Sequence, residues 1–442
     1  TKTIYYFINR KTMVHLTEYN NRITQNTIGL GTMNKNKMEV LSPAGDMECL
    51  IKAVDFGADA VFLAGREFGM RTASKNFDAA ELAKAAEYAH SKGCKLYVTC
   101  NTLPRNSELD RLPGFLSSCR DVGVDAFIIA DMGVLELAKK YAPEVECHIS
   151  TQAGIVNYAA ANAFYNMGAS RVVLAREMSF DEIADIRAHI PDELEIEVFV
   201  HGAMCVSFSG RCLISAYMTG RDANRGDCAQ PCRWKYHLYE ENRQGQFFPV
   251  EESDGGTYLY NSKDMCLIDC IPQLYKAGVS SLKIEGRAKS AYYAAVVTNA
   301  YRHAVDGFYD GGCRDDYKVD ERIRQELEKI SHREYSQGFY PGGEPGQNTA
   351  DGGYIRRYDF VATCESSDGN EAVIIQRNRF FTGDTLDVLP PGGIPFDVVI
   401  NEMYNEDGES VESAPHPMQR LTAVTSRNIP AGSMLRKKRE EK

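Results

Sequence analysis

From Met38 onward, short runs of apolar residues alternate with longer stretches in which apolar residues recur at helical spacing. The segment 38–45, MEVLSPAG, shows the first pattern, and 46–57, DMECLIKAVDFG, shows the second and ends on a glycine. Continuously apolar runs of about four to eight residues are typical of parallel strands that are buried on both faces. We therefore expect eight strands, at 38–45, 58–65, 94–101, 124–131, 146–153, 169–177, 194–202 and 280–287.

Each expected strand is followed by a stretch with the period of an amphipathic helix. Eight strand–helix units in succession predict a (β/α)8 TIM-type barrel over residues 38–318. A doubly wound open sheet is the alternative, but it has about six strands and a glycine-rich first turn, whereas the first turn here reads SPAGD. The expected helices are at 46–57, 77–93, 106–122, 133–141, 157–167, 180–188, 263–278 and 290–308.

The pattern changes beyond residue 318. Residues 319–353 contain one short helical stretch, at 321–330, and we interpret them as a connector. From 354 to 442, short alternating runs are separated by Gly, Asp and Pro, which is typical of an antiparallel sheet. We predict a small antiparallel β-barrel there, with the terminal RKKREEK (436–442) as a solvated tail.

The first 37 residues lack both periods and contain six Lys or Arg but a single Glu. We expect 1–37 to be a disordered extension that the fold does not need. This segment also lacks the apolar core of a signal peptide. The chain contains no run of about 18 apolar residues, so we expect no transmembrane helix and no membrane partner.

Composition limits the partners and the location of the protein. The chain has 50 Lys and Arg against 61 Asp and Glu, and this net charge of −11 argues against general affinity for nucleic acid. A small basic channel on an acidic body is compatible with the same numbers. Thirteen cysteines without a secretion signal indicate a reducing compartment. We therefore expect a cytoplasmic protein in which most thiols, Cys266 and Cys270 included, are core residues.

Polar residues close most of the expected barrel strands. Active sites of (β/α)8 barrels lie at the carboxyl ends of the strands and in the loops that follow them. The longest of these loops, about 206–262, follows the seventh strand, and long loops in compact domains are usually functional or disordered. The polar residues at the strand ends are Ser42, Arg66, Asn101, Asp131, Gln152, Arg176, Glu177, His201, Glu285 and Arg287.

Four cysteines at this loop, Cys205, Cys212, Cys228 and Cys232, have the spacing C-x6-C-x15-C-x3-C. Their Gly, Pro, Asp and Arg neighbours do not suit core thiols, and a disulfide set does not suit a reducing compartment. Structural zinc commonly uses two short cysteine pairs, and only one is present. A [4Fe–4S] cluster tolerates varied spacing, so we favour it over zinc, core packing and a single cysteine nucleophile beside His201.

The block EVFVHGAMCVSFSGRCLIS resembles the signature of the collagenase-like peptidase U-32 family. Further matching blocks are VLSPAGD, HISTQ, YLYNSKDM, LKIEGR and SHREYSQGFY, and QRNRFFTGDTLDVLPP looks like the family's C-terminal domain. Within the family, the chain is most similar to the prephenate-dependent tRNA uridine 5-hydroxylation proteins. This resemblance implies conversion of the wobble uridine of certain tRNAs to 5-hydroxyuridine, with prephenate as co-substrate and an iron–sulfur cluster on the cysteines of this block. Related branches are implied to hydroxylate ribosomal RNA cytidine or to act in ubiquinone hydroxylation.

The family name makes a peptidase the alternative function. The chain has no HExxH zinc motif and no GxSxG elbow. His201 could act as the base for Ser207 or Ser209, although spacing identifies no partner carboxylate. In a hydroxylase, His201 is the predicted general acid or base, and its alternative role is simple packing at the barrel rim.

A hydroxylase that uses prephenate needs cations for the two carboxylates of that ligand, and arginines bind carboxylates with two parallel hydrogen bonds. Arg176, Arg211 and Arg287 lie at or near the expected active face. We predict them as substrate-binding residues, together with Gln152 and Glu285. The alternative for each arginine is a salt bridge with a glutamate that holds the rim of the barrel.

An RNA substrate must also reach this face, where a base would unstack against aromatic or arginine planes. Trp234, the only tryptophan, could stack on such a base or pack over the cluster. The C-terminal β-domain could follow the RNA backbone, with tRNA as the expected partner. The arginines for that surface are Arg333, Arg356, Arg357, Arg377 and Arg379.

Overall fold

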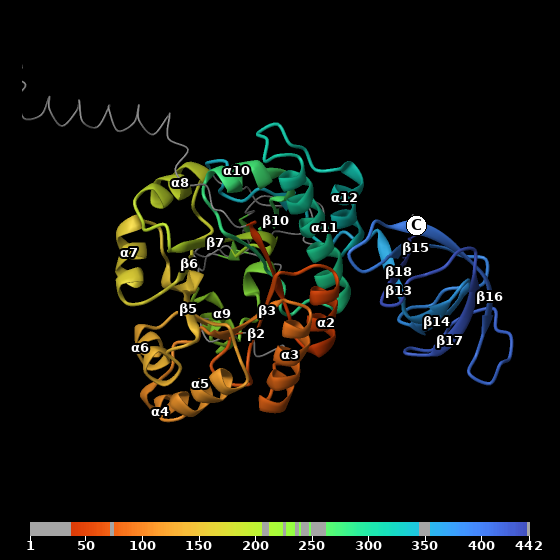
Figure 1. Ribbon diagram of the computed structural model, residues 1–442, viewed down its shortest axis with the longest axis horizontal. Coiled ribbons are helices and arrows are strands. Elements are labelled where there is room, and N and C mark those ends of the chain that lie inside the picture. The colour runs from red at the N-terminus through yellow and green to blue at the C-terminus, as the bar shows by residue number, and fades with distance from the viewer. Residues whose placement is uncertain are drawn as a thin grey trace, which may run out of the picture. The chain divides into compact units, whose positions relative to one another are not determined.

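Eight parallel strands form a closed barrel with helices around its outside (Figure 1). The strands are β1 (Glu39–Pro43), β2 (Ala60–Leu63), β3 (Lys95–Cys100), β4 (Ala126–Ile129), β5 (Glu146–Ile149), β6 (Arg171–Val173), β7 (Glu195–Ala203) and β11 (Ser281–Ile284). They pair in chain order, and β11 closes the ring by pairing with β1 on one side and β7 on the other. The predicted (β/α)8 barrel is confirmed.

The computed structural model describes residues 37–70, 75–205, 212–223, 227–234, 238–239, 247–248, 262–343 and 354–439. The predicted extension, apart from Lys37, lies outside these ranges, and so does much of the loop after β7. Within the described ranges, no helix combines the length and the apolar character needed to cross a membrane.

Local sequence signals begin the helices that follow the strands. Asp78 and Glu81 form a capping box at the start of α3 (Ala79–Ser91), and Ser179 and Glu182 form another at α8 (Phe180–Ala188). Such caps satisfy the first N–H groups of a helix and contribute typically about 1 kcal/mol each. The other helices are α2 (Met47–Asp55), α4 (Asn106–Leu109), α5 (Leu112–Asp121), α6 (Met132–Tyr141), α7 (Tyr158–Asn166), α9 (Ile214–Thr219), α10 (Ile271–Lys276), α11 (Ala291–Asp310) and α12 (Glu321–Glu326).

Strand β7 continues past the end of the barrel. Its last residues pair with the antiparallel strand β10 (Asp264–Cys266), which in turn pairs with β12 (Tyr335–Ser336). The register between β7 and β11 shifts beside His201, as in a β-bulge. Gly202 makes the bend possible, because its φ is 109° and an added Cβ would lie 2.5 Å from a backbone oxygen.

The predicted helix at 263–278 is wrong in its first part, where β10 forms instead. The sequence DMC pairs along the exposed edge that β7 offers, so tertiary pairing overrides the local helical pattern. Cys266 is therefore in a strand, and Cys270 precedes α10. Both thiols still pack with the hydrophobic core, as expected.

The C-terminal residues form a second, closed barrel of six antiparallel strands (Figure 1). Its strands are β13 (Tyr358–Asp368), β14 (Glu371–Gln376), β15 (Thr385–Leu389), β16 (Phe396–Tyr404), β17 (Arg420–Thr425) and β18 (Met434–Lys438). The remaining two strands, β8 (Leu238–Tyr239) and β9 (Phe247–Phe248), form a short pair in the long loop after β7 of the first barrel. The predicted solvated tail is wrong for residues up to 438, because β18 pairs with β13 and β15 and completes the barrel. Arg436, in that strand, is fully buried and forms an ion pair with Glu326 at 2.6 Å.

Alternate residues of the eight strands face the helices and the barrel interior, as strand geometry requires. The outward residues belong to one large hydrophobic core. Inward apolar residues of β1 to β4 form a small separate cluster: Leu41, Ala60, Phe62, Tyr97, Ala126 and Ile128. The interior beside β5, β6, β7 and β11 contains buried polar and charged side chains instead, among them His148, Arg171, Glu197 and Lys283.

Candidate active site at the barrel mouth

A cavity lies at the carboxyl ends of the strands in the eight-stranded barrel. Four of the predicted substrate-binding residues line it together: Gln152, Arg176, Glu285 and Arg287. They follow β5, β6 and β11, and closure of the barrel brings these loops to one place. Asn101 lines the same cavity, with its amide 3.4 Å from the side-chain oxygen of Gln152. The structure thus assembles these predicted residues, while their contacts to a ligand stay a prediction.

Arg287 is fixed in the wall of this cavity. Its side chain is 4% exposed and donates hydrogen bonds to Thr99 Oγ1 at 3.0 Å, to Asn76 Oδ1 at 3.1 Å and to the carbonyl of Met70. Acceptors from strand β3 and from the loop after β2 hold one planar guanidinium, so its orientation is set before any ligand binds.

The sequence suggests that Arg176 either lines the binding site or forms a salt bridge at the barrel rim, and the structure shows both features. It lines the cavity, and its Nη2 lies 3.5 Å from Glu285 Oε2, so a rim salt bridge exists with Glu285. Its Nη1 donates to the carbonyl of Ala203 at 3.0 Å, and its guanidinium lies 3.8 Å from the centre of the Phe199 ring. The buried Nε has no hydrogen-bond partner among the described residues. A donor of this kind is available to an acceptor that enters the cavity.

Sequence reasoning missed Lys283, which lines the same cavity. Its ammonium lies 2.6 Å from Glu197 Oε1 and over the rings of Phe62 and Phe199, at 4.6 and 5.6 Å. The one available signal was a lysine in the middle of an otherwise apolar strand, SLKI. With Arg176 and Arg287, it makes three cations against the single carboxylate of Glu285 among the described lining residues, so this lining favours an anionic ligand.

His201 is not among the residues that line this cavity. The bulge in β7 turns its side chain away, and it is 1% exposed among three tyrosine rings whose centroids lie 5.4 to 6.0 Å away. Burial, with smaller effects of His332 and Lys289, lowers the pKa of His201 to about 3. The structure therefore gives the predicted acid or base no access to the cavity. The tyrosines are Tyr293, Tyr301 and Tyr335.

Several predicted residues lie elsewhere. Arg211, Ser207 and Ser209 fall outside the described residues. Arg333 is 4% exposed, with its guanidinium over the Tyr354 ring at 4.7 Å, so it does not belong to an RNA-facing surface.

The predicted arginine surface of the C-terminal barrel is smaller than expected. Arg377 pairs with Glu48 of α2 at 2.7 Å and joins the two barrels. Arg356 and Arg379 are exposed, and Arg357, also exposed, pairs with Glu328 at 3.1 Å. The residues that remain available for a polyanion are Arg356, Arg357 and Arg379.

The four cysteines of the loop after β7 differ from most of the other thiols. Cys205 is exposed, and Cys212, Cys228 and Cys232 are half-buried, whereas most of the others are buried as expected. The 3-10 helix η3 (Pro231–Arg233), which contains Cys232, contacts α9, which begins two residues after Cys212. The backbone N–H of residue 230 donates to Cys228 Sγ at 3.3 Å.

An iron–sulfur cluster fits this donor set in part. Four exposed or half-buried thiols, with a backbone N–H directed at one sulfur, are donors of the kind that such clusters use. The ligand sphere itself is not formed, because within the described ranges no three His, Cys, Asp or Glu side chains lie close enough to hold a metal ion. The cluster therefore stays a prediction.

Comparison with known protein families identifies the chain. Residues 45–350 match Peptidase family U32, and residues 356–436 match the Peptidase family U32 C-terminal domain. The chain belongs to peptidase family U32. The resemblance inferred from the sequence blocks is confirmed, and the first match includes the cavity and all four loop cysteines.

This U32 chain is similar to relatives whose names indicate different activities. It is 36% identical to the tRNA hydroxylation protein P1 of Bacillus subtilis, over 96% of this chain and 100% of that protein. It is 35% identical to the tRNA hydroxylation protein P of Escherichia coli, over 86% of this chain and 92% of that protein. It is also 32% identical to the collagenase of Porphyromonas gingivalis, over 72% of this chain and 77% of that protein.

The loops after the strands of this U32 barrel carry an unusual share of exposed apolar side chains. Of the eleven large hydrophobic residues that are exposed in the described chain, eight lie in these loops, including the short helix α9, or at the first turns of the helices that follow. Tyr217, on α9, is 86% exposed. We call this set the apolar rim: Leu103, Met132, Val156, Tyr158, Leu213, Tyr217, Met218 and Trp234.

Proposed function

We propose that this chain is an RNA-modifying enzyme that hydroxylates the wobble uridine of tRNA at position 5, with prephenate as co-substrate. The observation that carries the proposal is the cavity at the barrel mouth, whose described lining contains Arg176, Lys283 and Arg287 against the carboxylate of Glu285. Prephenate has two carboxylates, and three cations can bind both. Two relatives named tRNA hydroxylation proteins, each more than a third identical over most of the chain, support RNA as the other substrate.

The chain's own residues supply binding and orientation. Arg287 is held by its three acceptors, so it can present its guanidinium to a carboxylate without losing much side-chain freedom. The amides of Asn101 and Gln152 can bind the hydroxyl or keto oxygen of the ligand. Glu285 restrains Arg176 and repels a carboxylate from that side of the cavity.

The cysteines would add the redox chemistry. A [4Fe–4S] cluster held by Cys205, Cys212, Cys228 and Cys232 would supply one-electron transfer at the loop after β7. Among these cysteines, Cys205 is the exposed one and lies two residues after the end of β7.

The apolar rim supports access for an unstacked base. Proteins that bind single-stranded RNA loops stack bases on exposed aromatic side chains, and such contacts tolerate any base. Tyr217 and Trp234, 86% and 42% exposed, are aromatic residues of this kind in the loop after β7. The acidic body of the protein makes stacking more important than general phosphate attraction, since the net charge is −11.

Nucleoside mass spectrometry of tRNA tests the proposal. Cells that lack the protein should lose 5-hydroxyuridine derivatives, and the wild-type chain should restore them. Cys205→Ala should not restore them, whereas the matched variant Cys313→Ala, in a half-buried thiol far along the chain, should. Unchanged nucleosides in the deletion strain would reject tRNA hydroxylation. Restoration by Cys205→Ala would reject the role of the cluster.

Proteolysis is the second candidate, because the family name and the collagenase relative suggest it. The structure offers it little support, since the predicted base His201 is buried away from the cavity. Cleavage of gelatin by the purified chain, abolished by His201→Ala or Ser209→Ala, would favour the peptidase. We expect no cleavage.

A further inference from the structure

A ladder of alternating charges runs along the interior of the eight-stranded barrel. Lys283 Nζ lies 2.6 Å from Glu197 Oε1, and Glu197 Oε2 lies 3.2 Å from Arg171 Nη1. Arg171 Nη1 in turn lies 2.6 Å from Glu39 Oε1, and its Nη2 lies 2.6 Å from Glu195 Oε2. The ladder joins β11, β7, β6 and β1, so only the closed barrel can form it.

The central members of the ladder are almost completely removed from water. Glu197 is 0% exposed, Arg171 3% and Lys283 4%. Burial by itself raises the pKa of Glu197, but the charges of Lys283 and Arg171 outweigh this effect and lower it, so the carboxylate stays ionised. Buried ion pairs of this kind are often no more stabilising than apolar residues of the same volume. Stability alone therefore does not explain why this half of the interior is ionic.

Only one charge of the ladder reaches the cavity at the mouth. Of the five residues, Lys283 lines that cavity and the others do not. Glu197 is its single hydrogen-bond partner among the described residues, and an ammonium has three N–H donors. Two donors of Lys283 are thus available to a ligand, beside the apolar faces of Phe62 and Phe199.

Lys283 also lies deeper than the two arginines of the cavity. It is inside β11, whereas Arg176 follows the end of β6 and Arg287 follows the end of β11. One arginine can bind a carboxylate through two parallel hydrogen bonds, so the pair at the mouth suffices for one carboxylate. A second carboxylate that enters further would meet Lys283.

We infer that Lys283 is a specificity-determining residue of the cavity, which binds the second carboxylate of a small dicarboxylate while Glu197 and Arg171 position it. The inference rests on the proposed function and deepens it, because it assigns the preference for a dicarboxylate over a monocarboxylate to one side chain. The ladder supplies the rigid, charged base on which that ammonium is held.

Calorimetric titration with two probes tests this role. Prephenate has two carboxylates, and phenylpyruvate shares its pyruvyl carboxylate but lacks the carboxylate and the hydroxyl of the prephenate ring; the Lys283 variants change the contact to the carboxylate and leave the amides of Asn101 and Gln152 in place. The wild-type chain should bind prephenate about tenfold or more tightly than phenylpyruvate, because one charged hydrogen bond contributes at least that factor. Lys283→Met/Glu197→Gln removes both charges of the pair and leaves Arg171 with Glu39 and Glu195. This variant should lose the preference while it still binds phenylpyruvate.

Two further variants keep the inference open to refutation. Lys283→Arg retains a cation and should keep the preference for prephenate, even if the double variant is unstable. Lys95→Met, in an exposed lysine of β3, is the matched control and should bind both probes as the wild type does. If the folded double variant keeps the preference for prephenate, or if its affinity for both probes falls equally, Lys283 does not determine the specificity. Either result leaves the proposed co-substrate in place. A wild-type chain that binds neither probe overturns the proposed co-substrate as well.

Discussion

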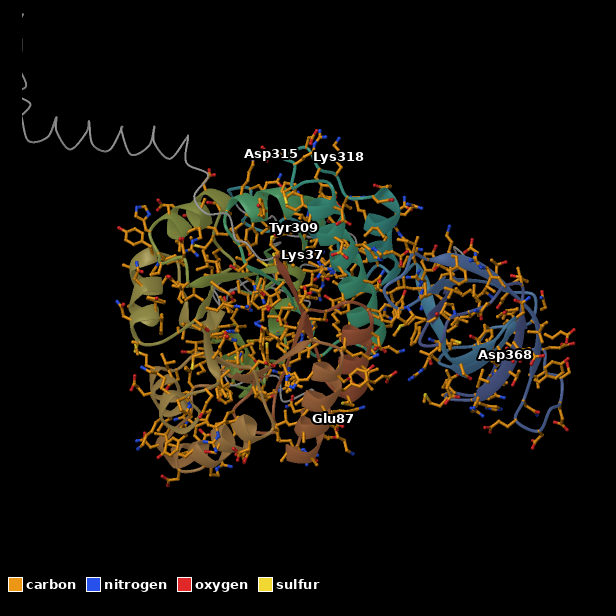
Figure 2. All side chains as sticks on the ribbon, viewed as in Figure 1. Lys37, Glu87, Tyr309, Asp315, Lys318 and Asp368 are labelled. Atoms are coloured by element: carbon orange, nitrogen blue, oxygen red, sulfur yellow. The ribbon has the colours of Figure 1, made fainter. Side chains whose placement is uncertain are left out.

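The two barrels of this chain fill their interiors in different ways. In the six-stranded barrel, sixteen hydrophobic side chains form one buried cluster, and its buried arginine, Arg436, pairs with Asp387 of β15 and with Glu326 of α12. In the eight-stranded barrel, a small apolar cluster lies beside a ladder of charges that ends at a cavity. Figure 2 shows ordinary surface charges for contrast, with Glu87 and Asp315 on the outside of the first barrel and Asp368 on that of the second.

The interior of the six-stranded barrel is thus packed for stability, whereas the interior of the eight-stranded barrel also carries charges that support a ligand site. Apolar packing is stabilising at every position, whereas a buried charge has a desolvation cost that its partner only offsets. Burial of Arg171, Glu197 and Lys283 inside the barrel lowers stability, but it holds the charge of Lys283 in a fixed position at the cavity. We expect stability and ligand binding to be coupled in the first barrel and independent in the second.

Of the substitutions that test this difference between the barrels, Glu197→Gln should lower the stability of the protein most. It leaves the ammonium of Lys283 buried without its counter-charge, which should lower the free energy of unfolding by about 3–5 kcal/mol. Urea denaturation followed by circular dichroism measures the loss. The double variant Lys283→Met/Glu197→Gln should recover most of it. If the double variant is as unstable as the single one, the ladder does not act as an ion pair.

Leu421→Ala should destabilise the six-stranded barrel and leave ligand binding by the eight-stranded barrel unchanged. Leu421 is 1% exposed in the apolar cluster of the C-terminal barrel, and truncation of a buried leucine costs about 3 kcal/mol. The folded variant should still bind prephenate with wild-type affinity, because no residue of this barrel lines the cavity. Loss of binding in a sample that remains folded by circular dichroism would show that the barrels are coupled.

The sequence predicts the architecture of both barrels better than what fills them. Apolar runs and turn residues suffice to locate strands, because these signals are local. The ladder is not local, since Arg171 and Glu39 are 132 residues apart and meet only when the barrel closes. Strand β18 was missed for a related reason. Its basic residues resemble a solvated tail, and only pairing with β13 and β15 makes it a strand.

In the candidate site, too, the sequence predicts the residues with a local signal and misses those whose position depends on the folded barrel. Five of the polar residues predicted at strand ends do line the cavity, because the ends of parallel strands meet at one edge. His201 obeys the same rule in the sequence, but a bulge beside Gly202 turns it outward, and the spacing of residues does not reveal that bulge. Lys283 was overlooked because it is inside an apolar run rather than at its end.

Acidification should weaken the first barrel through His201. A pKa of about 3 in the fold, against an ordinary value of 6.5, means that the unfolded chain takes up a proton there first. The stabilisation by the neutral imidazole is complete above pH 6.5 and is lost as the pH falls toward 3. At pH 5 the loss amounts to about 2 kcal/mol.

Thermal unfolding of wild type and His201→Phe at pH 7.5 and pH 5 measures this effect. Phenylalanine removes the titrating group and keeps a ring among the three tyrosines. The variant should lose less stability than the wild type between the two pH values, and both should bind prephenate at pH 7.5, because His201 does not line the cavity. Equal losses in the two proteins would show that other groups control the acid response.

Tyr217→Ala should have the smallest effect on stability and should decide which barrel faces the RNA. Tyr217 is 86% exposed on the apolar rim, and Phe381 is 45% exposed on the C-terminal barrel, so the two aromatic residues form a matched pair. Loss of one stacking contact weakens binding by about 1 kcal/mol, or roughly fivefold in the Kd for tRNA. Phe381→Ala should leave that Kd unchanged in the same filter-binding assay. The reverse result would place the RNA on the C-terminal barrel beside Arg379, and the ionic interior of the first barrel would then serve the small ligand alone.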